Sequence, residues 1–368
     1  MLKNKKLKKL ITKPSLFFKD YLNKKYPVYL NEMKCPQEEE QIIISYDEKI
    51  EKLFKNSDSI DVVFTWVDNK DLNWKEKYNF FSKIDKKSLG KYAKDSARFE
   101  NHDELYYSLQ SVLKFLPWVK KIFLVTDNQT PSWLKSIKTD KIHVVDHSEI
   151  IPSKYLPTFN SHVIEAHLHK IKDISENFIY FNDDVFVARA LEASHFFKCN
   201  GHASLFISSK SLNYMLERGT LTPTLSASLS SSKLLQRKFG IRPETPLVHT
   251  YVPLRKSDYL QVWKCYEKEI ESFLSNKFRT DNDLNLATFL VPWFSYLKGK
   301  SIIQRDICYY FNIRSRSAKS FYKAIRKAKN DGYSPHSFCA NDFNSQNTPL
   351  ESYQEILEAE LKFYYEKD

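Results

Sequence analysis

Glycine is scarce in this chain. Only 6 of its 368 residues are glycine, and no three of them lie close together. A dinucleotide-binding fold needs a G-x-G-x-x-G turn, and a P-loop enzyme needs a glycine-rich loop around its phosphates. Both motifs are absent from the sequence, which argues against NAD enzymes and P-loop kinases. Any phosphate binding must therefore depend on cations and side chains.

Cysteine pairs and long hydrophobic runs are also missing. The five cysteines are widely spread and form no C-x-x-C pair, so the sequence predicts neither a zinc framework nor a secreted disulfide scaffold, and a reducing compartment fits best. No apolar run approaches the length of a membrane span, and no signal-peptide core follows the N-terminus. With 42% hydrophobic residues, the chain has enough apolar material for a substantial folded core.

Acidic residues are nearly absent from the first 25 residues. Nine lysines accompany a single aspartate there, so this segment carries +8 of the total net charge of +12. Leucine and phenylalanine side chains are interleaved with the lysines, a composition typical of binding to an anionic membrane surface. A solvated lysine-rich tail is the alternative. The rest of the chain is close to neutral and carries no recognition motif, so we expect no nucleic acid partner.

Aspartate follows each of four apolar runs in the first half of the chain. These runs are 60–67 before Asp68, 121–126 before Asp127, 142–145 before Asp146, and 178–181 before Asp183 and Asp184. Near-continuous apolar runs predict strands that are covered on both faces. Helical patterns at 103–115 and 162–174 separate them, which predicts an α/β fold with a mostly parallel sheet. Ligands bind beyond the carboxyl ends of such strands, so we expect several carboxylates on one rim.

The last of these runs ends in Asn182, Asp183 and Asp184. Two adjacent carboxylates at a strand end are a common way to hold a divalent cation, Mg²⁺ or Mn²⁺, against the diphosphate of a nucleotide sugar. An acidic turn that only closes the strand is the alternative, because Asn and Asp are ordinary turn residues. Because aspartate also follows the other three apolar runs, a metal site is favoured over a turn that only closes the strand.

Two downstream segments carry further candidates. His249 lies in a proline-bounded apolar segment, where it is either a catalytic base or a packed core histidine. Arg279, Asp281 and Asp283 precede a long apolar helical pattern. The two aspartates are suitable helix caps, whereas the guanidinium of Arg279 suits bidentate contact with a phosphate.

Composition divides the chain into segments. Residues 1–57 form a basic lead-in without a strand pattern. The Ser/Thr-rich stretch 219–233 is interpreted as a mobile loop or as an insertion without a role. Helices are predicted over 257–276, 283–297 and 351–367 from their apolar spacing.

Taken together, four segments resemble the conserved regions of the Stealth family: 60–68 (IDVVFTWVD), 97–133 (beginning ARFENHDELYYSL), 159–184 (ending FIYFNDD) and 338–342 (FCAND). That family comprises sugar-1-phosphate transferases, including bacterial capsule polymerases and the animal N-acetylglucosamine-1-phosphotransferase. The resemblance implies a catalytic domain over 58–345 with a glycosyltransferase-A-like sheet flanked by helices. Additional C-terminal helices would include an amphipathic one, over 346–368, packed on that domain.

The reaction implied by the resemblance moves a hexose- or N-acetylhexosamine-1-phosphate from a UDP-sugar to an acceptor hydroxyl. It forms a phosphodiester and releases UMP. The acceptor would be an oligosaccharide or a lipid-linked polysaccharide. Metal-dependent glycosyl transfer with release of UDP is the alternative reaction. A non-enzymatic scaffold of a capsule assembly complex is a third interpretation.

The resemblance also assigns roles to individual residues. Catalysis falls to His249 as the base, Arg279 on the transferred phosphoryl group, Asp283 as the residue that orients either of them, and Asp184. Asp183 and Asp184 would hold the metal. The residues that would bind the substrate are Asp68, Arg98, Asp103, Asn160, Asn341 and Asp342, of which the last two come from the loosest match. The family does not demand histidine at the position of His162, which argues against a catalytic part for it.

The chain resembles the compact bacterial members of the family. The expected location is therefore the bacterial cytoplasm, peripheral on the inner face of the cytoplasmic membrane. Other capsule assembly proteins are expected as further partners.

Overall fold

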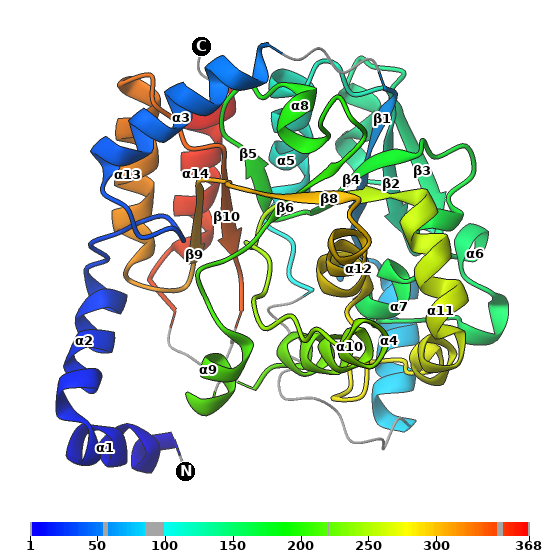
Figure 1. Cartoon of the computed structure of the whole chain (residues 1–368), viewed down its shortest axis with the longest axis horizontal. Coiled ribbons are helices and arrows are strands. Elements are labelled where there is room, and N and C mark those ends of the chain that lie inside the picture. Colours follow the sequence, from blue (N-terminus) through cyan, green and yellow to red (C-terminus); the bar gives the residue numbers. More distant parts are fainter. Residues whose placement is uncertain (1, 54–57, 85–98, 220, 344–348, 367–368) are drawn as a thin grey trace.

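The computed structural model describes residues 2–53, 58–84, 99–219, 221–343 and 349–366. Its largest sheet has five strands in the order β3-β2-β1-β4-β7 (Figure 1). These strands are β1 (Ile60–Thr65), β2 (Ile122–Thr126), β3 (Ile142–Asp146), β4 (Asn177–Asn182) and β7 (Val252–Arg255). The first four are parallel, and β7 pairs with β4 in the antiparallel sense. The predicted α/β fold with a mostly parallel sheet is confirmed.

Register aligns the carboxyl ends of the parallel strands. Thr65 at the end of β1 lies opposite Asn182 of β4 and Val125 of β2. Alternate residues of the strands face two different cores. Val63 belongs to the core under α11 (Lys256–Leu274) and α12 (Val291–Leu297), and its neighbour Phe64 belongs to the core under α5 (Glu104–Phe115). Burial on both faces explains why β1, β2 and β4 lack polar alternation. For β3 the expectation of cover on both faces is wrong, because this strand lies at the edge of the sheet and two of its five residues are exposed.

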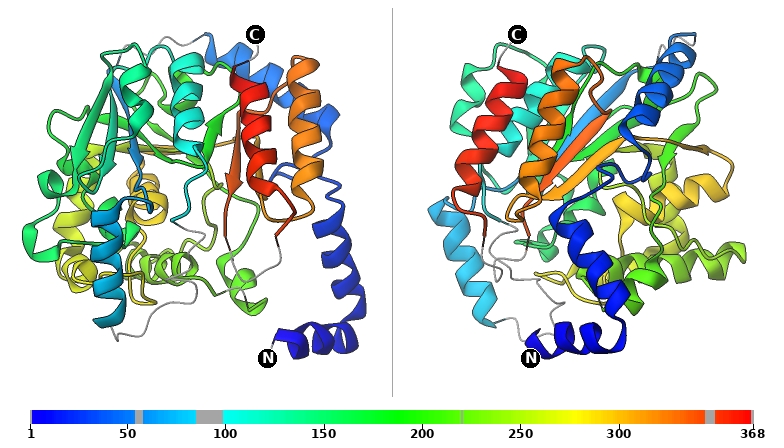
Figure 2. Two further views of the ribbon diagram at one scale, coloured as in Figure 1. Left: turned by 180° about the vertical axis from the view of Figure 1, so that it is seen from behind. Right: turned by 90° about the vertical axis from the view of Figure 1, so that its left-hand side faces the viewer.

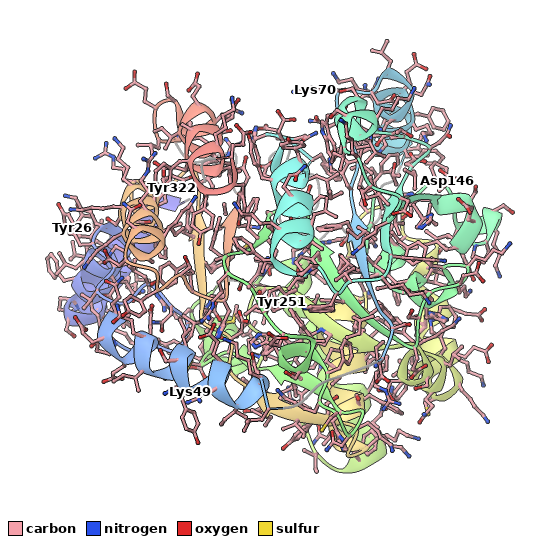
Figure 3. The ribbon with its side chains drawn as sticks, turned by 90° about the horizontal axis from the view of Figure 1, so that it is seen from above. Tyr26, Lys49, Lys70, Asp146, Tyr251 and Tyr322 are labelled. Atoms are coloured by element: carbon pink, nitrogen blue, oxygen red, sulfur yellow. The ribbon has the colours of Figure 1, made fainter. Side chains whose placement is uncertain are left out.

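A second sheet continues from the end of β4. It contains β5 (Val185–Val187), β10 (Ser337–Asn341) and β9 (Cys308–Asn312), in that order. The helices that share its core are α3 (Gln37–Glu51), α13 (Ala318–Asn330) and α14 (Tyr353–Tyr365). In α14, Tyr365 donates a hydrogen bond from its hydroxyl to the carbonyl of Val187 at 2.8 Å, which ties the C-terminal helix to β5. Viewed from above, Tyr251 lies in the interior and Asp146 at the periphery (Figure 3).

The remaining elements are short or peripheral. Two strands, β6 (Ala203–Phe206) and β8 (Ser301–Gln304), form a small parallel sheet. The other helices of the folded body are α4 (Leu72–Ile84), α6 (His147–Ile150), α7 (Ser161–Glu165), α8 (Ala193–Phe196), α9 (Leu212–Glu217) and α10 (Pro223–Phe239).

The expectation of a mobile loop over 219–233 is wrong. Most of this stretch belongs to α10, which begins after the capping residue Thr222. Its serines face the protein and are satisfied there: Ser231 accepts a hydrogen bond from the backbone of Asn285 at 3.0 Å, and Ser232 donates one to the carbonyl of Pro243 at 2.5 Å. Tertiary hydrogen bonds thus stabilise a helix whose composition alone resembles a loop.

Two predicted helices are shorter than expected. The pattern at 162–174 forms α7 and then a 3₁₀ turn, Leu168–Lys170. The pattern at 283–297 forms a π-helical turn, Leu286–Leu290, before α12. Pro292 lies in the first turn of α12 and cannot donate a backbone hydrogen bond, which accounts for this break in the α-helical ladder.

The basic lead-in contains α1 (Leu2–Thr12) and α2 (Pro14–Lys25), followed by α3. Figures 1 and 2 show α1 and α2 extending along one side of the molecule, whereas α3 lies across the opposite end. Among the described helices, none is long and apolar enough to cross a membrane.

Candidate active site

The candidate site lies where β1 and β4 end. Tyr180 of β4 links the two strand ends, because its hydroxyl lies 3.0 Å from Thr65 Oγ1 and donates to Asn182 Oδ1 at 2.9 Å. The chain then turns through Asp183 and Asp184 and enters β5. The apolar strand thus ends where the polar turn begins, which places both carboxylates at the rim of the sheet.

Asp184 has one bound and one unbound carboxylate oxygen. Oδ2 accepts a hydrogen bond from Asn341 Nδ2 at 2.7 Å, and the thiol of Cys339 lies 3.4 Å from the same oxygen. Oδ1 is buried and has no hydrogen-bond partner among the described residues. Leaving a buried carboxylate oxygen without a partner is costly, and a hard divalent cation is a suitable ligand for it.

Other carboxylates crowd the same turn. Burial and the charges of Asp184 and Glu104 raise the pKa of Asp183 well above its usual range. Burial likewise raises the pKa of Glu104 to about 7, and Asp184 contributes to that increase. Three acidic groups close together repel one another. A bound divalent cation would neutralise this charge, but the potential ligand atoms that the described residues bring within 4.8 Å of one another here are those of Asp184, His249 and Cys339, without Asp183 or Glu104.

His249 is brought to Asp184. A ring nitrogen of His249, the thiol of Cys339 and a carboxylate oxygen of Asp184 all lie within 4.8 Å of one another. The His249 ring is solvent-exposed and lies beside Tyr310, with 5.0 Å between the ring centroids. An exposed imidazole next to an acidic turn is accessible to a substrate hydroxyl, which a packed core histidine is not.

Arg279 lies at another part of the rim. Its Nη1 donates to Thr224 Oγ1 at 3.0 Å, and its Nη2 donates to the hydroxyl of Ser161. Ser161 in turn donates to Glu165 Oε1 at 2.9 Å. Nε of Arg279 is buried and lacks a partner within the part of the chain that the structure describes. The guanidinium is thus held by neutral hydroxyls and keeps a donor for an anion.

Asp283 forms no hydrogen bond with Arg279 or His249, although its charge interacts with that of Arg279, so its role in orienting one of them stays a prediction. It is fully buried and accepts hydrogen bonds from Asn160 Nδ2 and Thr280 Oγ1, both at 2.8 Å. His162 Nδ1 lies 3.1 Å from it. Although burial opposes ionisation, the hydrogen bond from His162 lowers the pKa of Asp283. Asp283 therefore holds the loop that carries Arg279.

Asn160 does not line a substrate pocket, in contrast to its predicted role. Its side chain is fully buried, where it caps α7 through the backbone amide of His162 at 3.1 Å and binds Asp283. Amide and carboxylate satisfy each other in the interior, so Asn160 stabilises the turn instead of contacting a ligand.

The other predicted binding residues are dispersed. Asp68 accepts a hydrogen bond from the backbone of Lys70 at 2.8 Å, and Asp103 is exposed at the start of α5 with φ of 63°. Asp342 is engaged by Arg314, whose Nη2 lies 3.0 Å from Oδ2, and by His102 Nε2, also at 3.0 Å. Arg98 lies outside the described residues.

Of the strand-end carboxylates from which a shared rim was expected, two are engaged by local structure. Asp127 forms an ion pair with Lys77, whose Nζ lies 2.5 Å from Oδ2. Asp146 caps α6 by accepting a hydrogen bond from the backbone of Ser148 at 2.8 Å, and it lies at the outer edge of the molecule (Figure 3). These two carboxylates are used by local structure, which leaves the ends of β1 and β4 as the site.

Sequence comparison identifies the family. The model of Stealth protein CR2, conserved region 2, matches residues 98–205. A capsular polysaccharide phosphotransferase of Aeromonas hydrophila is 57% identical over 93% of this chain and 95% of its own length. Another, from Actinobacillus suis, is 53% identical over 98% of this chain and 99% of its own. The chain belongs to the Stealth family.

Among solved structures, the Stealth chain has a likeness to a galactosyltransferase in complex with donor and acceptor sugar analogues. The two are 12% identical with a TM-score of 0.39, and the match covers 83% of this chain and 96% of that one.

Several residues at this Stealth site were missed from sequence. Glu104 directly follows the predicted Asp103, and Cys339 lies inside the FCAND segment at 338–342. Both residues could therefore have been identified from these motifs. Ser161 and Thr224 gave no signal, because hydroxyl residues at helix starts are ordinary caps. Only the tertiary fold brings them to Arg279.

Proposed function

We propose that the chain is a capsular polysaccharide phosphotransferase. It transfers a hexose- or N-acetylhexosamine-1-phosphate from a UDP-sugar to an acceptor sugar hydroxyl, forms a phosphodiester and releases UMP. The observation that carries this proposal is that the exposed His249 lies close to the carboxylate of Asp184, whose Oδ1 has no hydrogen-bond partner among the described residues. Its relatives are named capsular polysaccharide phosphotransferases, which supports phosphotransfer in capsule synthesis.

Asp184 and Asp183 would hold the cation, with Glu104 as a nearby third carboxylate. When bound there, Mg²⁺ or Mn²⁺ offsets the charge of the donor diphosphate and stabilises UMP as the leaving group. Asn341 and Cys339 fix Oδ2 of Asp184, so that Oδ1 is held in one orientation.

His249 acts on the acceptor. Its imidazole takes the proton from the acceptor hydroxyl as that oxygen attacks the β-phosphorus, and the bond from this phosphorus to the oxygen of UMP breaks. The exposed position of the ring leaves room for a saccharide.

Arg279 acts on the phosphoryl oxygens. It forms no salt bridge with a carboxylate among the described residues, and its two terminal nitrogens are held by hydroxyls. Its charge is therefore available to a phosphate, and Ser161 and Thr224 keep the guanidinium in one orientation.

The acceptor is an oligosaccharide or a lipid-linked polysaccharide. Lysines and apolar side chains of residues 1–25 attach the enzyme to the anionic inner face of the bacterial cytoplasmic membrane, where other capsule assembly proteins are its neighbours.

The released nucleotide tests the reaction class. Metal-dependent glycosyl transfer uses a similar acidic turn but breaks the bond between sugar and phosphate, so it releases UDP. Incubation of the purified protein with a panel of UDP-sugars and an acceptor oligosaccharide, followed by chromatography of the nucleotides, is expected to give UMP. Release of UDP in proportion to product would refute phosphoryl transfer.

A further inference from the structure

The candidate site lies toward one end of the molecule. The carboxyl ends of β1 and β4 point to this end, and α1, α9 and α10 lie there in all the views of Figures 1 and 2. Because β7 is antiparallel to β4, His249, which precedes β7, lies beside the carboxyl end of β4. These helices therefore share one end of the molecule with the strand ends that carry the candidate site.

Large apolar side chains are exposed on three helices, α1, α9 and α4. Each is between 42% and 72% exposed, and they are Leu7 and Ile11 on α1, Tyr214 and Leu216 on α9, and Phe80 and Ile84 on α4. The C-terminal half of α4 extends to the same end as α1 in both figures. Three separate apolar tips thus lie at the end of the molecule toward which β1 and β4 point.

Basic residues accompany the apolar tips. Asp20 of α2 contacts Lys9 Nζ and Arg218 Nη2, each at 2.5 Å, and so joins α1 and α2 to the end of α9. Residues 1–25, which carry +8 of the net charge of +12, are thereby held at this end of the molecule. Lys83 adds an exposed cation between Phe80 and Ile84.

We propose that this end of the molecule, formed by α1, α2, α9 and the C-terminal half of α4, is a membrane-docking face whose partner is a bilayer with anionic head groups. Apolar side chains interspersed with lysines match such a surface in both respects: the apolar groups enter the boundary region, and the cations meet the lipid phosphates. The active site then faces the bilayer. The further consequence, that the acceptor arrives attached to a lipid, rests on the proposed function.

The test uses the full-length protein and vesicles of phosphatidylcholine with or without phosphatidylglycerol. Phe80→Ser combined with Ile84→Ser removes the tip of α4 without touching the basic segment. Ile42→Ser combined with Tyr46→Ser is the matched control, since these side chains are equally exposed, equally spaced on a helix, and lie on α3 at the other end. Co-sedimentation measures how much of each protein binds to the vesicles and how much stays in solution.

Wild type is expected to bind the vesicles with phosphatidylglycerol and to dissociate with salt. The α4 variant is expected to bind roughly tenfold more weakly, the change that partial burial of two large apolar side chains supplies, and the control to bind like wild type. Tyr214→Ser with Leu216→Ser on α9 provides a second variant if the first does not fold. Equal binding by the variants and the control overturns the proposal, as does lipid-free self-association that the α4 variant abolishes. Because vesicle binding needs no catalysis, failure here is distinguishable from failure of the proposed reaction.

Discussion

Asn341 donates a hydrogen bond from Nδ2 to Oδ2 of Asp184 at 2.7 Å, joining the end of β10 to the acidic turn after β4. The two residues are separated by more than 150 positions in the chain, and they meet because β10 pairs with β5 in the antiparallel sense. One side chain thus fixes the orientation of the other, and the free Oδ1 of Asp184 depends on this contact.

Replacing Asn341 by alanine is expected to lower turnover and the affinity for Mg²⁺ by 10- to 100-fold, about the cost of losing a group that orients a metal ligand. Steady-state kinetics at several metal concentrations would measure both. Asn213→Ala is the matched control, because its amide also donates to a carboxylate, that of Glu244 at 2.7 Å, outside the site. Equal effects in the two variants would show that Asn341 is merely structural.

Asp184→Asn is expected to reduce turnover by orders of magnitude while the fold remains intact, because no other group can replace the charge of a metal ligand. A chelator should abolish wild-type activity, and Mg²⁺ or Mn²⁺ should restore it. For comparison, Asp146→Asn removes a strand-end carboxylate that caps α6 and accepts a hydrogen bond from the backbone of Asn128. That variant should lose about 1 kcal/mol of stability or less and keep its activity. Full wild-type activity in excess chelator would exclude the metal.

The buried contacts of His195 with two carboxylates make the free energy of unfolding depend on pH. Its Nδ1 lies 2.8 Å from Glu51 of α3 and its Nε2 lies 3.0 Å from Asp306. Although burial lowers it, the charge of Glu51 and the contacts with Asp306 raise the pKa of His195 to about 9. The stabilisation is therefore complete below the ordinary histidine pKa of about 6.5 and is lost as the pH rises through 9.

Urea unfolding should accordingly show a free energy of unfolding that falls by on the order of a few kcal/mol between pH 6.5 and 9.5. His195→Gln should be less stable at pH 6.5 and lose most of this pH dependence. Contacts with His195 lower the pKa values of Glu51 and Asp306 despite burial. Both carboxylates therefore stay charged between pH 6.5 and 9.5, and their titration does not contribute to the change in stability. A slope unchanged in the variant would contradict the assignment.

Deleting residues 1–25 should release the protein from anionic vesicles but leave activity on a soluble acceptor nearly unchanged. Each lysine near an anionic leaflet contributes about 1 kcal/mol, and the segment holds nine. In the structure, α2 meets the end of α9 through the ion pair of Asp20 with Arg218. A truncated protein that is soluble but inactive would show that the segment belongs to the catalytic fold.

Local patterns in the sequence predicted the four parallel strands of the central sheet, because these strands are largely apolar and each ends in a polar turn. They did not predict β7, which pairs with β4 in the antiparallel sense. They failed at α10, where serines that look like loop residues are satisfied by partners such as Asn285, which lies 54 positions away from Ser231. They left open whether Asp283 is a helix cap or a carboxylate of the site, and only the fold shows that His162 and Asn160 surround it.

The most direct test of the proposed reaction is phosphorus NMR of the purified product made from a UDP-sugar and an acceptor oligosaccharide. Phosphoryl transfer from the β-phosphorus leaves one phosphorus atom in each newly formed linkage, and its coupling to protons of both sugars identifies a phosphodiester. We predict this resonance in the wild-type product and its loss with His249→Ala. A product that contains the new sugar but no phosphorus would show glycosyl transfer and contradict the account.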